Sequence, residues 1–171
     1  MNAPYRTLTA ADVRVGDRLP ELRVPVTATT VVIGASATRD WQPQHHDHDW
    51  AVNRAGTRDI FLNTPTQAGW IGRYVTDWTG PTGRIGRMAF RMRASICPGD
   101  EMVFNATVTD VSPGDQGVTW VALDIAVTVG ETVCTACTAT VAVPSSEGDN
   151  SWALRGEEWR IPEPTAPASG R

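Results

Sequence analysis

The chain has 171 residues, of which 41% are hydrophobic and 20% charged, a composition typical of one soluble globular domain with a sizeable core. Its formal net charge of −4, from 15 basic and 19 acidic side chains, gives no electrostatic reason to expect a nucleic-acid partner. No apolar run approaches the roughly 18–20 residues that cross a bilayer, and the N-terminal residues lack a secretory signal. These features predict a cytosolic protein, away from any membrane, whose three cysteines are reduced.

The first elements of the chain are short. Residues 22–26 are expected to form a strand, with Pro25 marking an edge or an end. Thr29 or Thr30 is a candidate N-cap for a following helix that ends near Asp40.

Two further helices are expected before the strands. Asp47 is the candidate cap of a short helix over 50–55. The clearest helical pattern covers 63–78, with Thr64 as a plausible N-cap, Pro65 in the first turn and a Gly-Pro stop. This helix is expected to be largely buried, because apolar residues recur on it at helical spacing: Ala68, Ile71, Val75 and Trp78, widened by Trp70 and Tyr74.

From residue 84 the hydrophobic period changes from that of a helix to that of a strand. Turn signals separate four candidate strands, at 85–96, 101–111, 117–129 and 132–143. A long helix followed by antiparallel strands is an α+β arrangement, and a sheet wrapped around the helix would bury it. We therefore expect one domain over 1–144.

Residues 145–171 are rich in Ser, Glu, Gly and Pro and are expected to form a polar C-terminal tail. Its apolar side chains could dock it on the body of the protein or on a partner: Trp152, Leu154 and Trp159.

Cys134 and Cys137 have the spacing of a redox C-x-x-C motif, but they lie inside a strand-like run over 133–141. Residues three apart in a strand point to opposite faces of the sheet. We therefore interpret the two cysteines as ordinary strand positions.

The polar stretch over 40–47 carries the candidate chemistry. Asp40 and His45 are five residues apart in a loop that turns at Pro43, so a carboxylate and an imidazole can converge on one water and share its proton. Each alone would be read as a solvent-exposed loop residue. His46, His48 and Asp49 extend the cluster and would suggest a metal, but a catalytic zinc needs three well-placed protein ligands. We expect no metal here.

The register of this stretch resembles the signature of the MaoC-type enoyl-CoA hydratases, in which a helix ends in Gly-Asp and continues x-Asn-Pro-x-His-x-Asp. The matching residues are Asp40, Pro43, His45 and Asp47, whereas Arg39 and Gln42 replace the usual Gly and Asn. Pro98-Gly99-Asp100 also resembles the turn after the family's first long strand. The resemblance covers residues 12–144 and implies a single hot-dog fold, an antiparallel sheet wrapped around a long central helix.

The resemblance implies an enzyme, a hydro-lyase that adds water to a 2-enoyl-CoA to give a 3-hydroxyacyl-CoA. Asp40 would then be the principal base and His45 its partner in orienting the water. In this family the enolate oxygen is held by a backbone N–H at the start of the central helix, usually from a Gly after a His. That place reads Leu62-Asn63-Thr64-Pro65 here, so Thr64 is the expected donor, beside Asn63 in the thioester site.

Three arginines could contact the phosphates of CoA. Arg87, Arg91 and Arg93 alternate along one candidate strand and would share one face. The alternative is an ordinary solvated strand face. Because CoA is part of the substrate, no separate cofactor is expected.

A narrower resemblance rests on Arg39-Asp40, His45-His46-Asp47 and residues 59–63 and 73–81. These look like the small MaoC subunit of actinobacterial steroid side-chain hydratases, which act on thioesters carrying a sterol ring system and pair with a second MaoC-like chain. The implied partners are an acyl-CoA thioester and either a second copy or a second MaoC-like chain. A hot-dog acyl-CoA thioesterase and a non-catalytic subunit that completes a partner's site are the alternatives.

Overall fold

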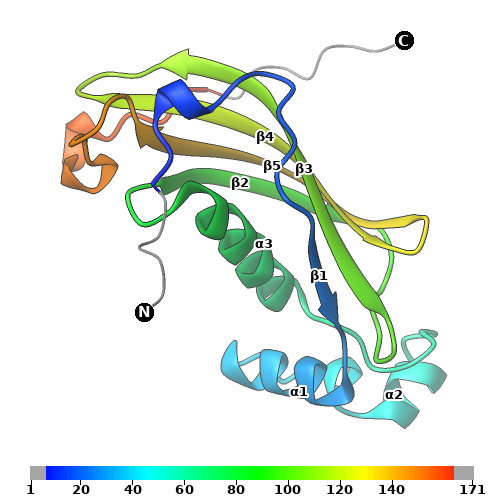
Figure 1. Cartoon of the computed structure of the whole chain (residues 1–171). Helices are drawn as coiled ribbons and strands as arrows, with labels where there is room; N and C mark the ends of the chain where they lie inside the picture. Colours follow the sequence, from blue (N-terminus) through cyan, green and yellow to red (C-terminus); the bar gives the residue numbers. More distant parts are fainter. Residues whose placement is uncertain (1–6, 164–171) are drawn as a thin grey trace, which may run out of the picture.

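One long helix, α3 (Thr64–Thr79), lies along the concave side of a five-stranded antiparallel sheet in the computed structural model, which describes residues 7–163 (Figure 1). The strands are β1 (Leu22–Pro25), β2 (Arg84–Met92), β3 (Glu101–Pro113), β4 (Val118–Val129) and β5 (Thr132–Pro144). Their order is β1-β3-β4-β5-β2, so β1 and β2 are the edges. The α+β prediction of a hot-dog sheet around a central helix is confirmed.

The predicted long helix forms, with a correction at its first turn. Asn63 and not Thr64 is the N-cap, because the Asn63 side chain accepts a hydrogen bond of 3.1 Å from the Thr66 N–H. An asparagine at this position is a stronger cap than a threonine. Gly80 ends the helix with a φ of 77°, a left-handed conformation that suits glycine.

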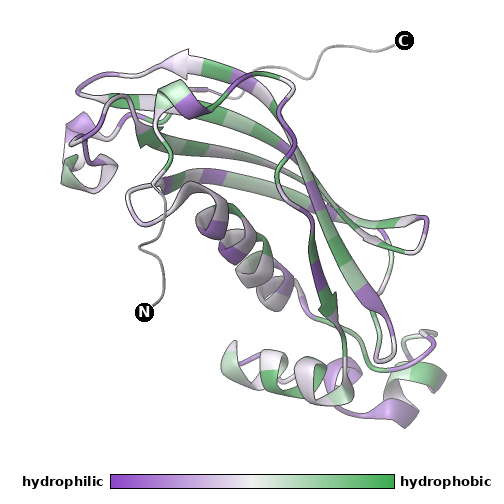
Figure 2. Cartoon of the chain, in the orientation of Figure 1, coloured by the Kyte–Doolittle hydropathy of each residue, from purple (hydrophilic) through white to green (hydrophobic). Residues whose placement is uncertain are grey.

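The core lies between α3 and the concave face of the sheet. Ile71, Tyr74 and Val75 of α3 are buried against strand residues such as Phe104 and Leu123. Hydrophobic positions recur along β3, β4 and β5 where these strands pass the helix (Figure 2).

The strand β2 is shorter than the predicted 85–96. After Met92 the chain turns away, and the N–H groups of Arg93 and Ala94 both donate to the carbonyl of Cys134, at 2.7 and 3.2 Å. The segment that follows runs to the start of α3, where the Leu62 N–H donates to the Ile96 carbonyl at 2.9 Å.

The interpretation of Cys134 and Cys137 as strand positions is confirmed, because both lie in β5, but the expectation that they face opposite sides of the sheet is wrong. Both are buried in the same core cluster. The pairing of β4 with β5 shifts at Thr128, whose partner is Val133, while Val127 pairs with Thr135. This bulge leaves Cys134 outside the regular alternation.

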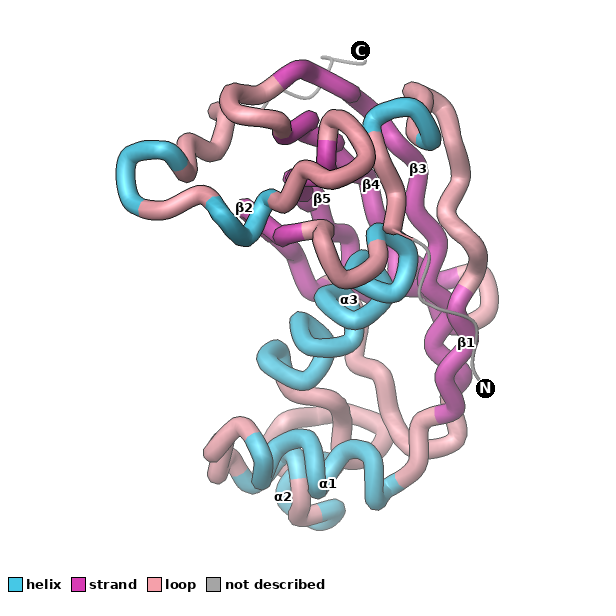
Figure 3. Tube along the Cα trace, turned by 60° about the vertical axis from the view of Figure 1, so that its left-hand side comes forward, coloured by secondary structure: helices cyan, strands magenta, loops and turns pink. Residues whose placement is uncertain are grey.

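Two short helices, α1 (Ala28–Ala37) and α2 (His48–Asn53), lie together beyond the N-terminal end of α3 (Figures 1 and 3). The predicted caps of the first were wrong, because Thr27 and not Thr29 or Thr30 is the N-cap, accepting from the Thr30 N–H at 3.0 Å. The predicted cap of the second is confirmed, since Asp47 accepts from the Trp50 N–H at 3.0 Å.

The described part of the chain also contains four single-turn 3₁₀ elements: η1 (Ala10–Asp12), η2 (Pro43–His45), η3 (Ser151–Ala153) and η4 (Gly156–Glu158). No helix within residues 7–163 is long and apolar enough to cross a membrane.

After β5 the chain returns to the sheet. Leu154 is buried in a second small cluster with Val118, Trp120 and Ala142 of the sheet, and Trp159 packs on Trp120 with ring centroids 4.9 Å apart. Residues 164–171 of the predicted tail lie outside the described residues. The domain boundary at 144 stays a prediction.

Candidate active site

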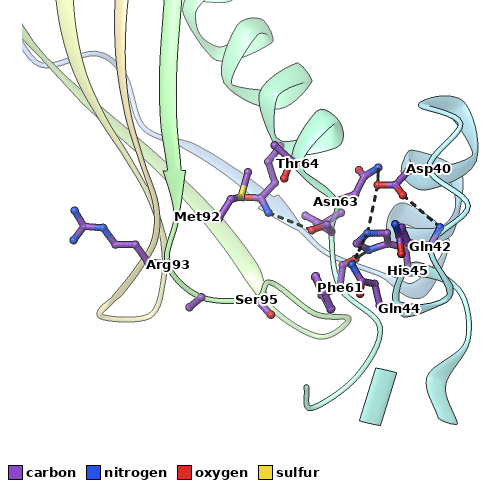
Figure 4. A pocket seen from close by; sticks show the side chains of 13 residues that line it. Asp40, Gln42, Gln44, His45, Phe61, Asn63, Thr64, Met92, Arg93 and Ser95 are labelled. Carbon is purple, nitrogen blue, oxygen red and sulfur yellow. Dashed lines mark hydrogen bonds and ion pairs between the residues drawn. The ribbon is translucent and has the colours of Figure 1, made fainter. Parts of the chain in front are cut away.

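A pocket of about 600 Å³ opens at the N-terminal end of α3 (Figure 4). Three segments line it: the loop after α1, the residues that lead into α3, and the end of β2. The pocket is lined by the candidate residues Asp40, His45, Asn63 and Thr64.

The local backbone explains how Asp40 reaches the pocket. The helix α1 ends at Ala37, and Arg39 then adopts a left-handed φ of 56°. This turn lets the Asp40 N–H donate to the Ala35 carbonyl at 2.9 Å. A non-glycine residue is uncommon in this conformation, which gives a physical reason for the glycine that the hydratase signature usually has in the place of Arg39.

Asp40 and His45 lie side by side. The distance from Asp40 Oδ2 to His45 Nε2 is 3.4 Å, and the side chains are 24% and 4% exposed. The predicted turn at Pro43 is the 3₁₀ turn η2, in which the His45 N–H donates to the Gln42 carbonyl at 3.1 Å. The sequence therefore brings the carboxylate and the imidazole together through one helix end and one tight turn.

A backbone carbonyl fixes the proton of the imidazole. His45 Nδ1 lies 2.7 Å from the carbonyl oxygen of Phe61. A carbonyl only accepts, so Nδ1 carries a proton, and a neutral His45 presents the lone pair of Nε2 to Asp40. The carboxylate and Nε2 are then both acceptors, and a water that contacts both from the pocket side would donate one hydrogen to each. The Gln44 amide nitrogen also lies 3.4 Å from Nε2.

The Asn63 side chain is turned towards Asp40 and not into open pocket space. Its amide nitrogen donates to Asp40 Oδ2 at 3.0 Å and to Thr38 Oγ1 at 2.8 Å, while its oxygen caps α3. Both amide hydrogens are therefore used. Donation from Asn63 to a thioester would have to come from the backbone N–H.

Thr64 begins α3. The first N–H groups of a helix have no acceptor within the helix. Here the Thr66 and Gln67 N–H groups are satisfied by Asn63, at 3.1 and 3.2 Å, and Pro65 has none. The Thr64 N–H remains at the positive end of the helix, where a developing negative charge is stabilised.

The three candidate arginines are separated. Met88 and Phe90 pack against the core, so Arg87 and Arg91 point to the other side of the sheet. Arg87 lies 3.9 Å from Glu163. Arg93 follows the end of β2 and is one of the residues around the pocket. Contact of the three arginines with the phosphates of CoA stays a prediction.

Two contributions were missed from the sequence. Gln67 lines the pocket and is 3% exposed; its oxygen accepts from Thr135 Oγ1 at 2.7 Å, and its nitrogen donates to the Leu62 carbonyl at 3.3 Å. A glutamine one turn before Ile71 on the apolar stripe was the available signal. The Phe61 carbonyl had no sequence signal, because any residue supplies one.

The His46, His48 and Asp49 side chains are exposed around the start of α2. Within residues 7–163, no three His, Cys, Asp or Glu side chains are grouped in a way that could hold a metal ion.

Comparison with known proteins gives sequence and fold relatives. No family model matches the chain. The 3-oxo-4,17-pregnadiene-20-carboxyl-CoA hydratase beta subunit of Mycobacterium tuberculosis is 43% identical over 100 residues, which cover 58% of this chain and 77% of the relative.

Solved structures agree with this relationship. A chain of the ChsH1–ChsH2 complex from Mycobacterium tuberculosis is 34% identical with a TM-score of 0.71, covering 76% of this chain and 98% of that chain. The (R)-hydratase from A. caviae involved in PHA biosynthesis is 19% identical with a TM-score of 0.68, covering 77% and 98%. The latter likeness is one of fold.

Proposed function

The chain belongs to the MaoC-like (R)-specific enoyl-CoA hydratase family, and from this premise we propose that it adds water to a 2-enoyl-CoA, with a bulky steroid side-chain thioester as substrate. The observation that carries the proposal is the Asp40–His45 pair, 3.4 Å apart at the head of α3.

The proposed chemistry is balanced by one water. Asp40 takes a proton from the water while His45 Nε2 accepts its other hydrogen in a hydrogen bond and orients it. The oxygen of the water bonds to the β-carbon, and the electron pair of the double bond moves into the thioester as an enolate. The Thr64 N–H holds the enolate oxygen, and the proton returns to the α-carbon through the pair. The reaction is redox-neutral, and CoA enters as part of the substrate, so no separate cofactor is proposed.

The substrate class and the partner rest on the relatives. One is named as the beta subunit of a hydratase of a pregnadiene-carboxyl-CoA, and another belongs to a complex of two differently named chains. We propose that this chain likewise pairs with a second MaoC-like chain and works in the cytosol. Among residues 7–163 no further strand pairs with β1 or β2 at the two edges of the sheet, and sheet edges favour association with another chain.

The test is an absorbance assay of the enoyl-thioester, with the chain alone and with a co-expressed MaoC-like partner. Asp40→Asn and His45→Ala should each lower kcat by about 10²-fold or more, the usual contribution of a general acid or base, with circular dichroism unchanged. Absence of turnover by the wild type, with steroid and straight-chain thioesters and with the partner, would overturn the proposal.

The same samples separate the alternatives. A thioesterase would release the thiol of CoA, which a thiol-reactive dye detects. The protein should contribute little background, because Cys97, Cys134 and Cys137 are all buried. Activity that survives Asp40→Asn in the complex would instead indicate a non-catalytic subunit.

A further inference from the structure

Asn63 is a buried polar residue whose side chain takes part both in the cap of α3 and in the candidate active site. It is 3% exposed, and it lies where the loop from α2 enters α3. One side of its amide caps the helix, and the other side holds the carboxylate of Asp40 (Figure 4). A cap needs only the oxygen, so the use of the nitrogen calls for its own explanation.

The contacts of the Asp40 carboxylate are few. Oδ2 accepts from Asn63 Nδ2 at 3.0 Å and faces His45 Nε2 at 3.4 Å, while Oδ1 accepts from the Gln42 N–H at a long 3.4 Å. Among the described residues, Asn63 thus makes the shortest hydrogen bond to this carboxylate. With a neutral His45, Oδ2 and Nε2 are two acceptors facing each other, and the amide hydrogen of Asn63 satisfies Oδ2 when no water contacts it.

Asn63 also ties the base to the end of the helix. Its oxygen accepts from the Thr66 N–H, and its backbone carbonyl accepts from the Gln67 N–H. The Thr64 N–H, the proposed donor to the enolate oxygen, lies within this capped turn. One side chain therefore sets the position of Asp40 relative to the donor.

We propose that Asn63 is a positioning residue for hydration: it holds the Asp40 carboxylate in a fixed orientation beside His45 and at a fixed place relative to the Thr64 N–H. This rests on the proposed function above. A base held within a few tenths of an ångström of its productive place contributes to kcat, while substrate binding depends little on it. The role differs from a contact with the thioester, because both amide hydrogens of Asn63 are used within the protein.

Asn63→Ser separates the two functions of the side chain. Serine is about as good an N-cap as asparagine, but its hydroxyl is too short to replace the amide nitrogen at Asp40. We expect kcat to fall by about 10-fold or more and KM to stay close to the wild type. The melting temperature should fall as well, because the amide hydrogen bond to Thr38 Oγ1 is also lost. An unchanged kcat in Asn63→Ser would overturn the inference.

Asn63→Asp gives a readout that a structural role would not produce. Aspartate also caps a helix, but it places a second carboxylate against Asp40, and two close carboxylates tend to share one proton. The variant should have low kcat near pH 8 and recover part of it, relative to the wild type, as the pH falls and the introduced carboxyl group becomes a donor. If the ratio of the variant kcat to the wild-type kcat stays constant as the pH falls from 8, the inference is contradicted.

Thr27→Val is the matched control for loss of a helix cap. Thr27 caps α1 by accepting from the Thr30 N–H, and it does not line the pocket. This variant should lose some thermal stability and keep the wild-type kcat. Loss of kcat in Thr27→Val comparable to that in Asn63→Ser would mean that general loosening explains both.

A measurement without turnover separates this inference from the proposed function. In a ¹⁵N spectrum of the protein, the Asn63 side-chain amide should shift on Asp40→Asn, because its acceptor changes from charged to neutral. If the Asn63 amide signal shifts but the wild type hydrates no thioester, the Asn63–Asp40 hydrogen bond is supported and the proposed reaction is rejected. If the wild type hydrates a thioester but the Asn63 amide signal does not shift, only the Asn63–Asp40 hydrogen bond is rejected.

Discussion

Cys137 holds its thiol in the core beside the strand β2. It is 2% exposed, and burial raises the pKa of this thiol to about 11 from an ordinary value of 9.0. Tyr74 behaves in the same way on α3, where burial raises the pKa of its phenol to about 12. In both groups the charged form is the deprotonated one, so burial favours the protonated form.

The consequence is a loss of stability at alkaline pH. Above pH 9 the Cys137 thiol ionises in the unfolded chain but not in the folded one, so its contribution is present below pH 9 and is lost as the pH rises to about 11. Tyr74 extends the loss towards pH 12. We expect the urea midpoint to fall between pH 8.5 and pH 10.5, and Cys137→Ala to fall less steeply over that range. If the urea midpoints of the wild type and Cys137→Ala fall equally with pH, the loss of stability does not come from the Cys137 thiol.

The site also shows which residue-level features a sequence can carry. The convergence of Asp40 and His45 was predicted from their spacing around the turn at Pro43, and their catalytic role from the resemblance to the hydratase signature. The role of Asn63 could not be predicted in the same way. Its contact with Asp40 joins residues 23 apart in the chain and depends on how α1 crosses α3.

That crossing is close. An added Cβ at Gly34 of α1 would lie 2.4 Å from Oγ1 and 2.8 Å from Cγ2 of Thr66 in the first turn of α3. The missing side chain at Gly34 therefore lets the two helices approach, and this approach brings Asp40 within reach of Asn63.

Gly34→Ala should push the two helices apart. We expect a loss of about 1–3 kcal/mol in the free energy of unfolding, the usual cost of overpacking, together with a lower kcat. Thr66→Ala should cost little by itself, since the buried Thr66 hydroxyl has no hydrogen-bond partner among the described residues. The double variant should regain much of the lost stability and activity in urea denaturation and absorbance assays. If the losses of the two single variants add up in the double variant, contact between the methyl group added at position 34 and Thr66 does not cause the effect of Gly34→Ala.

The tail is a second element held by tertiary contacts. The Arg84 guanidinium lies over the rings of Trp159 and Trp152, at 3.7 and 5.2 Å from their centroids, and it donates to the Leu154 carbonyl at 3.1 Å. These contacts join the start of β2 to the tail, at the end of α3 away from the pocket (Figure 1).

Leu154→Ala tests this attachment. Leu154 is 5% exposed, and truncation of a buried leucine costs about 2–5 kcal/mol. We expect that loss in urea denaturation with kcat unchanged, because the pocket lies at the other end of the helix. Val15→Ala, at a side chain that is 62% exposed, is the matched control and should cost less than about 0.5 kcal/mol. An effect of Leu154→Ala no larger than the control would mean that the tail is not attached in solution.

The sequence predicted the elements better than their ends. The apolar stripe of α3 and the alternation of β3, β4 and β5 are local patterns that the final packing also uses. The end of β2 is set by hydrogen bonds to the Cys134 carbonyl, which lies on another strand. The burial of both Cys134 and Cys137 is set by a bulge between β4 and β5. Neither feature can be predicted from the local sequence.

At the scale of the whole molecule, one chain carries all the proposed chemical groups. Asp40, His45, Asn63 and Thr64 line a single pocket, and the hydrogen bonds that hold them come from the same chain. A partner on an edge of the sheet is therefore not needed to supply the base.

This arrangement predicts how activity depends on subunit composition. Complexes assembled with the second MaoC-like chain from mixtures of wild-type and Asp40→Asn protein should lose kcat in direct proportion to the fraction of variant, because each site uses one Asp40 with the His45 of its own chain. Native mass spectrometry would give the composition and the absorbance assay the rate. If each site needed groups from two copies of this chain, activity would fall with the square of the wild-type fraction. Curvature of that kind would show that the pair 3.4 Å apart within one chain is not the complete acid–base machinery.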